Sequence, residues 1–308
     1  MTPDSLHIPP FLRRGDCIGL FSPSGPLRDH DRLDKGISIL RDLGFTVRPP
    51  LLPPKQHEYL AADDHDRARA FHALLDDEQV DALMAVRGGY GCQRMLPLID
   101  LELVRARPKL IIGFSDLTIL LNTTAARSRV PAVHGPVVTT LCDCDRETIQ
   151  AFTAMLSGSL DSYSAPRGLE VLRPGTATGV LAGGNLTSLA HLLATPWDID
   201  WQDTVLFLED TGEPMYRVDR MLTQLSQAGK LDKLAGLVLG SFGLGRDGAE
   251  NLRLQEQIWY RVLELTEESG YPVWGGFPVG HLPRNYPLPL GARATMDGSS
   301  GRLQWQLR

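Results

Sequence analysis

The residues with the clearest chemical potential are Phe114-Ser115-Asp116, which follow the short apolar run Leu110–Gly113. A strand that turns through glycine, presents a serine and enters a helix exposes a nucleophilic hydroxyl in α/β enzymes, close to helix-terminal N–H groups that stabilise an oxyanion. The usual pattern has a second glycine at position 117, where this chain has leucine. Ser115 is therefore a candidate nucleophile, and a serine that merely caps a helix is the alternative.

A nucleophilic serine needs a base that accepts its proton, and histidine is the usual base. Two of the eight histidines lie in segments bounded by glycine and proline, which would hold a side chain in place without burying it in a core. They are His134, before Gly135-Pro136, and His281, between Gly280 and Leu282-Pro283. The residues alone do not choose between the two.

A carboxylate that could orient the base follows the apolar run Val205–Leu208. Glu209 stands at the expected end of this strand, where sites form in α/β folds. Carboxylates at strand ends also cap the next helix, which is the alternative interpretation. The competing carboxylates are Asp116, Asp210, Glu213 and Asp219.

The elements that must position these residues alternate between strand and helix. Strands are expected at 17–21, 45–48, 82–86 and 110–113, and helices at 29–43, from 63 onward and near 92–99. Continuous apolar strands separated by helices predict a mainly parallel sheet with helices on both faces. Its carboxyl edge, where ligands bind, would carry the loops Ser22–Pro26, Arg87–Gly91 and Gly113–Asp116. Within the second loop, Gly88-Gly89 allows close backbone approach or positive φ, or forms a simple tight turn.

Gly, Ser, Pro and Asp dominate residues 157–175, which predicts a boundary between two domains. We expect an N-terminal α/β domain at 1–160 that carries the serine elbow, a linker at 161–175, and a smaller C-terminal α/β domain at 176–308. In the latter, strands are expected at 178–182, 205–208 and 234–240, a Gly-Gly-Asn turn at 183–185, and helices up to 193, at 219–228 and at 251–268.

The composition limits the classes of function. With 43% hydrophobic and 22% charged residues, the chain of 308 residues is typical of a globular protein. Its net charge of −6 argues against nucleic-acid binding, which needs clustered basic side chains. Neither a signal-peptide core nor a stretch of ~18 apolar residues occurs, so we expect a cytoplasmic protein that does not bind membranes.

The four cysteines fit a reducing compartment better than a disulfide framework. Cys142 and Cys144 flank a single residue and lack a second pair of ligands, so we expect no metal site. Cys92 is a minor alternative nucleophile, disfavoured because it falls in a short helix with no base nearby in sequence.

Six motifs follow one another along nearly the whole chain. They are Arg87-Gly88-Gly89-Tyr90-Gly91, Leu110–Asp116, His134-Gly135-Pro136, Gly183-Gly184-Asn185-Leu186, Leu208-Glu209-Asp210 with Glu213-Pro214 and Tyr216-Arg217, and Gly280-His281 followed by Asn285. Together and in this order they resemble the LD-carboxypeptidase family of serine peptidases, which includes muramoyltetrapeptide carboxypeptidases. Microcin C self-immunity hydrolases are a related branch.

This resemblance implies a catalytic triad of Ser115, His281 and Glu209, and an oxyanion hole formed by the backbone of Asp116 and of Gly88 or Gly89. It implies a serine carboxypeptidase that releases terminal D-alanine from murein tetrapeptides during cell-wall recycling, through an acyl-enzyme and without a cofactor. The implied partner is a small muropeptide substrate, and the implied assembly is a homodimer.

A carboxypeptidase must bind a free carboxylate, which a guanidinium does with two hydrogen bonds. Arg87 and Arg217 are candidates, although Arg217 lies beside a helix start and could instead serve in a structural ion pair.

Two other functions stay open. A microcin C-type hydrolase of peptidyl or aminoacyl nucleotide conjugates would use the same triad; the absence of an obvious long insertion between Asp210 and Leu234 favours the cell-wall branch. A non-catalytic peptide-binding or sensing protein is the other, and the joint presence of Ser115, Glu209 and His281 argues against it.

Overall fold

The computed structural model describes residues 6–51, 58–244 and 248–307, which form two compact units. The first unit comprises residues up to Leu160 together with Pro287–Gly291 and the end of the chain from Leu307. The second comprises Asp161–Tyr286 and Ala292–Gln306. In the described part of the chain, no helix has both the length and the apolar character needed to cross a bilayer.

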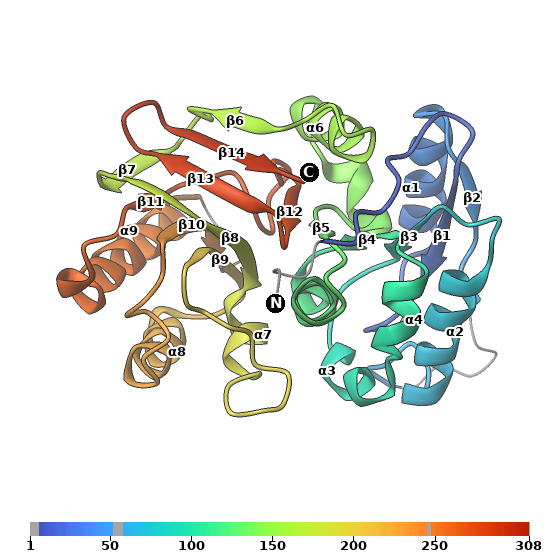
Figure 1. The fold of residues 1–308 in the computed structure, drawn as a ribbon, viewed down its shortest axis with the longest axis horizontal. Coiled ribbons are helices and arrows are strands. Elements are labelled where there is room, and N and C mark those ends of the chain that lie inside the picture. The colour runs from blue at the N-terminus through green and yellow to red at the C-terminus, as the bar shows by residue number, and fades with distance from the viewer. Residues whose placement is uncertain (1–5, 52–57, 245–247, 308) are drawn as a thin grey trace. The chain divides into compact units, whose positions relative to one another are not determined.

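The first unit is built on a six-stranded sheet in the order β12-β5-β4-β3-β1-β2, flanked by helices (Figure 1). Five strands are parallel, and β12 pairs antiparallel with β5. The strands are β1 (Cys17–Phe21), β2 (Thr46–Arg48), β3 (Ala82–Ala85), β4 (Leu110–Gly113), β5 (Ala132–His134) and β12 (Leu288–Leu290). All residues of β3 and β4 are buried, as expected for strands covered on both faces. The predicted parallel sheet with flanking helices is thus confirmed.

The two longest helices of this unit, α1 and α2, begin where an aspartate side chain accepts from one of their first N–H groups. Asp29 accepts from the N–H of Arg32, and Asp63 accepts from that of Asp66. The helices are α1 (His30–Asp42), α2 (Asp64–Asp76), α3 (Cys92–Met95), α4 (Leu101–Ala106), α5 (Thr118–Thr123) and α6 (Arg146–Leu156). Further helical turns are η1 (Leu96–Leu98), η2 (Ser115–Leu117), η3 (Thr124–Ser128) and η4 (Val138–Asp143).

The second unit has an eight-stranded mixed sheet in the order β6-β14-β13-β8-β9-β10-β11-β7. The strands from β8 to β11 are mutually parallel, and the outer strands pair antiparallel. They are β6 (Ser162–Ser164), β7 (Glu170–Arg173), β8 (Thr176–Asn185), β9 (Thr204–Thr211), β10 (Gly236–Gly243), β11 (Val273–Gly275), β13 (Arg293–Asp297) and β14 (Arg302–Gln306).

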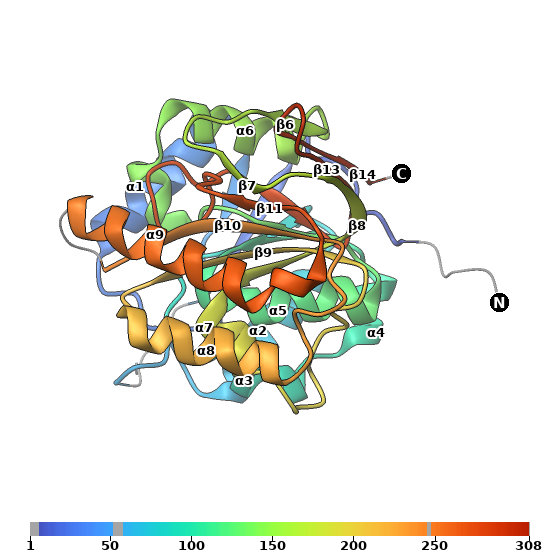
Figure 2. The ribbon, with the colours of Figure 1, turned by 90° about the vertical axis from the view of Figure 1, so that its left-hand side faces the viewer.

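The described residues of this unit also form α7 (Leu186–Ala190), α8 (Met215–Gln227), α9 (Gly248–Leu265) and the turn η5 (Glu267–Ser269). Figure 2 shows α8 and α9 side by side in front of β9 and β10. Leu222 of α8 and Ile258 of α9 share one buried core with Leu206 and Leu237 of those two strands. The helices therefore share a buried apolar core with the central strands of this sheet.

Several expected boundaries are wrong. Residues 161–175 are no linker, because β6 and β7 lie within them and pair with β14 and β11. Residues 287–291 belong to the first unit, so the region 176–308 is not a single domain. The expected turn at Gly183-Gly184-Asn185 continues β8, since these residues pair with Phe207, Leu208 and Glu209 of β9. Glycine and proline mark irregular backbone, but they do not reveal whether that backbone pairs with a distant strand.

Candidate active site

Ser115 occupies the turn between β4 and α5 with a backbone φ of 65°. A residue with a Cβ pays about 1–3 kcal/mol for this left-handed conformation, and such strain gathers at functional sites. The turns that follow, η2 and α5, have no side-chain cap hydrogen bond. The interpretation of Ser115 as a helix cap is therefore wrong.

The leucine at position 117 is compatible with the elbow because it packs on the preceding glycine. A Cβ placed at Gly113 would lie 2.8 Å from Leu117 Cγ, so only glycine leaves room for this side chain. Leu117 itself is completely buried. The elbow thus needs glycine at position 113, before the serine, and has the buried Leu117 where a second glycine is usual.

The three loops expected at the carboxyl edge of the first sheet do meet around Ser115. Gly25 N–H donates to the Gly88 carbonyl at 3.3 Å. A Cβ at Gly88 would lie 2.9 Å from Ser115 Cβ and 3.0 Å from its Oγ. Gly89 differs from Gly88 in having a φ of 126°. The first glycine therefore permits close approach to the serine, and the second permits the turn.

The carboxylate of Asp116 lies beneath the elbow. Its Oδ2 accepts from Ser24 Oγ at 2.6 Å and from the N–H of Cys92 at 2.9 Å. Burial raises the pKa of Asp116. Burial, with the nearby Asp116, also holds the pKa of the Cys92 thiol far above its usual range, which disfavours the thiolate that a cysteine nucleophile requires.

The second unit holds a carboxylate and a histidine in direct contact. Glu209 lies within β9, completely buried, and its Oε2 is 2.7 Å from Nδ1 of His281. The His281 side chain is 22% exposed and lies in the loop after β11. When Nδ1 carries the proton donated to Glu209, Nε2 is the ring nitrogen that accepts a proton.

Glycine allows this pair to form. Gly280 has a φ of 119°, and a Cβ there would lie 2.8 Å from Glu209 Oε2 and 2.5 Å from Ser241 Oγ. Its N–H donates to Asn285 Oδ1 at 3.0 Å, which ties the two ends of the His281 loop together. These contacts account for glycine and asparagine on either side of the histidine.

The pKa of His281 is subject to opposing influences. Burial lowers it, because desolvation disfavours the imidazolium. The negative charge and hydrogen bond of Glu209 raise it, and the net shift is upward. The arrangement therefore stabilises a protonated imidazole, as a general base requires once it has accepted a proton.

The other carboxylates considered for this role have different partners. Asp210 accepts from Asn185 Nδ2 and from the backbone and hydroxyl of Thr187, and so anchors the start of α7 to β9. Adjacent residues of a strand point to opposite faces, which separates Asp210 from Glu209. Glu213 pairs with Arg217, and Asp219 pairs with Arg261.

His134, the other candidate base, is completely buried in β5. Its ring meets that of Phe114 edge-on, with centroids 5.9 Å apart. Burial of the whole side chain leaves no surface for a substrate. His281, which keeps part of its ring exposed beside a carboxylate, is the better placed of the two.

The described residues include no group of three or more His, Cys, Asp or Glu side chains placed to hold a metal ion. The thiols of Cys142 and Cys144 contact the backbone carbonyls of Thr139 and Thr140.

Two family models match most of the chain: the LD-carboxypeptidase N-terminal domain over residues 18–135 and the LD-carboxypeptidase C-terminal domain over 178–296. The chain belongs to the LD-carboxypeptidase family. It is accordingly an enzyme of the serine peptidase class, a carboxypeptidase.

Relatives extend this similarity over nearly the full length. A protein named probable murein peptide carboxypeptidase from Bacillus subtilis is 32% identical, covering 94% of this chain and 91% of that protein. The crystal structure of a muramoyltetrapeptide carboxypeptidase from Oxalobacter formigenes is 31% identical, with a TM-score of 0.77 and coverage of 94% and 97%.

The second branch of the family is similar as well. The microcin C7 self-immunity protein MccF from Escherichia coli is 26% identical, covering 93% of this chain and 92% of that protein. A structure of MccF in complex with glutamyl sulfamoyl guanosine has a TM-score of 0.87 at 22% identity, covering 97% and 98%. That likeness concerns the fold alone.

The two arginines considered for binding a substrate carboxylate, Arg87 and Arg217, differ in environment. Arg87 is half-buried, and its Nη1 donates to the Pro26 carbonyl at 2.9 Å. Among the described residues no carboxylate forms an ion pair with it, and burial together with the like charge of Arg28 lowers its pKa. Arg217 is 54% exposed and already paired with Glu213 at 3.4 Å.

Sequence reasoning missed one residue of this region, Arg67 of α2. It is buried and donates to the carbonyls of Pro23 and Gly91. No local pattern distinguishes it, because its acceptors are backbone atoms 44 and 24 residues away. Only the tertiary structure brings them together.

Proposed function

We propose that this carboxypeptidase hydrolyses the L,D-peptide bond that releases terminal D-alanine from murein tetrapeptides. The observation that carries the proposal is the buried Glu209 in contact with His281, in a chain that also holds Ser115 on a strained elbow against Gly88. The two similar proteins named as murein peptide and muramoyltetrapeptide carboxypeptidases support this choice of substrate. A cytoplasmic homodimer acting on free muropeptides is part of the same proposal.

The proposed triad consists of Ser115, His281 and Glu209. His281 removes the Ser115 proton as Oγ attacks the scissile carbonyl, and Glu209 fixes the imidazole tautomer and stabilises the imidazolium. Backbone N–H groups of Asp116 and of Gly88 or Gly89 hold the oxyanion, each contributing on the order of 3 kcal/mol. His281 then protonates the leaving amine, and water releases the acyl group. No metal or organic cofactor takes part.

The experiment is incubation of the protein with a murein tetrapeptide, with products identified by mass, beside Ser115→Ala as the matched control. We expect release of D-alanine by the natural chain and a loss of several orders of magnitude in the variant. A fluorophosphonate probe should label the natural chain and leave Ser115→Ala unlabelled. Chelators should change neither result.

Two outcomes would contradict the proposal. Cleavage of an aminoacyl-sulfamoyl adenylate with the tetrapeptide left intact would assign the chain to the activity suggested by its similarity to MccF. Absence of both cleavage and labelling would indicate a peptide-binding or sensing protein.

We further propose that Arg87 binds the terminal carboxylate of the substrate. Arg87 precedes Gly88, where an added Cβ would lie 3.0 Å from Ser115 Oγ, and its guanidinium has no carboxylate partner among the described side chains. We expect Arg87→Ala to lower kcat/KM about 10- to 100-fold, the effect of losing a charged hydrogen bond. Arg217→Ala is the control and should change it by less than about twofold.

A tetrapeptide amide separates carboxylate recognition from general damage. If Arg87 binds the carboxylate, the natural chain should have a low kcat/KM for the amide. Arg87→Ala should lower that kcat/KM little further. Equal losses for acid and amide in Arg87→Ala would show that the arginine acts elsewhere.

A further inference from the structure

The strained conformation of Ser115 requires surroundings that hold it. The residue that follows, Asp116, is only 6% exposed, and a carboxylate so deeply buried is costly unless its hydrogen bonds define a fixed place for it. The contacts of Asp116 therefore indicate what fixes the elbow.

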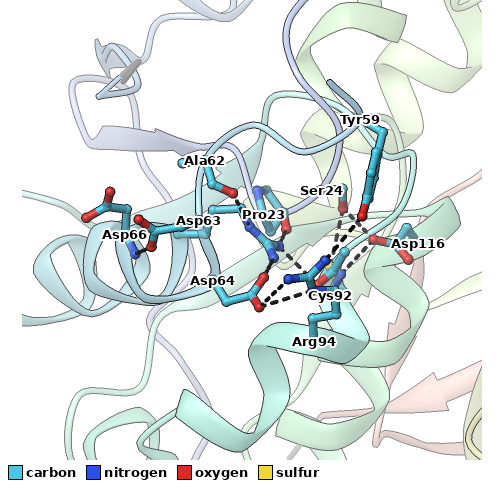
Figure 3. Close-up of polar contacts among 12 residues, drawn as sticks. Pro23, Ser24, Tyr59, Ala62, Asp63, Asp64, Asp66, Cys92, Arg94 and Asp116 are labelled. Atoms are coloured by element: carbon cyan, nitrogen blue, oxygen red, sulfur yellow. Dashed lines mark hydrogen bonds and ion pairs between the residues drawn. The ribbon is translucent and has the colours of Figure 1, made fainter. Parts of the chain in front are cut away.

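One oxygen of Asp116 joins the three loops that meet at the nucleophile. Ser24 comes from the loop after β1, and Cys92 directly follows the glycine-rich loop Arg87–Gly91. Both donate to Oδ2, at 2.6 Å and 2.9 Å, and Figure 3 shows the two residues next to the Asp116 carboxylate. Ser24 and Cys92 are completely buried, so water does not compete for these hydrogen bonds.

Arg67 fixes the backbone next to each of the two donors, Ser24 and Cys92. Arg67 is 3% exposed and donates to the carbonyl of Pro23, which precedes Ser24. It also donates to the carbonyl of Gly91, which precedes Cys92, at 3.0 Å. Arg67 thus fixes the peptide groups that precede Ser24 and Cys92, and these two residues donate to Asp116.

Further contacts fix the guanidinium itself. Arg67 Nε donates to the Ala62 carbonyl at 3.2 Å, and Nη2 pairs with Asp64. Asp64 also binds Arg94 at 2.9 Å, and Figure 3 shows it beside that side chain. A planar guanidinium with donors in a fixed fork suits a site that must hold several carbonyl groups at once.

We propose that the Asp116 side chain is a positioning residue that holds Ser115 and the neighbouring backbone N–H in their reactive arrangement, with Arg67 keeping its two donors in place. The proposal rests on the proposed function, because it assigns a role to Asp116 through Ser115. It requires a hydrogen-bond acceptor at Oδ2 and no proton transfer by the carboxylate. An amide oxygen in the same place should therefore serve nearly as well.

The test compares Asp116→Asn, Asp116→Ala and Ser24→Ala by the rate of fluorophosphonate labelling and by kcat and KM on the tetrapeptide. We expect Asp116→Ala to lower both the labelling rate and kcat about 100-fold, the effect of a misplaced reacting group, with KM within about threefold. Asp116→Asn should stay within about fivefold of the natural chain. Ser24→Ala, which removes one of two donors, should lose about tenfold.

Asp100→Ala is the matched control. Asp100 also accepts two backbone N–H bonds in the first unit, from Glu102 and Leu103 at the start of α4. Its loss should lower the melting temperature and leave the labelling rate unchanged. A purely stabilising role for Asp116 would make the two alanine variants behave alike.

The outcomes separate this proposal from the proposed function. A natural chain that is neither labelled nor active contradicts the proposed function and, with it, this inference. A labelled natural chain with Asp116→Ala labelled equally fast overturns the positioning role alone, and so does an Asp116→Asn variant as slow as Asp116→Ala. If Asp116→Ala fails to fold, Ser24→Ala decides, and labelling at the natural rate overturns the proposal.

Discussion

The His281 imidazole shows how one contact can decide the pH dependence of the enzyme. Burial lowers the pKa of the ring, Glu209 and the nearby Asp210 raise it, and the folded value lies above the ordinary 6.5. A general base must be neutral in the free enzyme. The rate at low substrate should therefore rise with pH through a pKa higher than 6.5.

Titration of the His281 ring protons by NMR measures this directly. We expect a pKa above 6.5 in the natural chain and a lower value in Glu209→Gln, which removes the charge and leaves the burial. Because the folded pKa is raised, the pair stabilises the fold fully below the unfolded pKa and loses this contribution as pH rises through the folded value. An unchanged pKa in Glu209→Gln would show that the 2.7 Å contact does not govern the histidine.

At the scale of elements, the sequence alone predicted the helices that begin at a capping aspartate and the strands that consist of a continuous apolar run. Asp29 and Asp63 cap α1 and α2 within a residue of the predicted starts, and the apolar runs matched β1, β3 and β4. The glycine below Ser115 and the glycines opposite it were likewise visible in the sequence, because close approach and positive φ select that residue.

Strands that exist because they pair with a strand far away in the sequence could not be predicted from local patterns. β7 pairs with β11 about a hundred residues later, and Glu209 lies inside β9 because Asn185 of β8 continues to pair with it. The contact between Glu209 and His281 also spans 72 residues. No local spacing chooses His281 over His134, so the motif order shared with a family supplied what the residues alone could not.

At the scale of the whole molecule, the chain does not form two domains one after the other, because segments of the two units alternate along the sequence. β12 lies in the C-terminal part of the sequence but pairs with β5, with Leu288 opposite His134 and Leu290 opposite Ala132. Figure 1 shows β12 at the edge of the first unit's sheet, beside β5. Both leucines are completely buried. The first unit is therefore complete only with a strand that lies, along the chain, between two segments of the second unit.

A fragment of residues 1–160 should accordingly be less stable than the first unit. Without β12 it exposes the N–H and C=O groups of β5 and loses two buried leucines, each worth roughly 2–5 kcal/mol by analogy with leucine-to-alanine changes. We expect the fragment to aggregate or to melt well below a version in which residues 286–292 are joined to it by a flexible Gly-Ser linker. The same fusion with Leu288→Ala and Leu290→Ala is the control and should behave like the fragment alone. Equal melting temperatures for all three, measured by circular dichroism, would show that β12 adds no stability and that the division at residue 160 is sufficient.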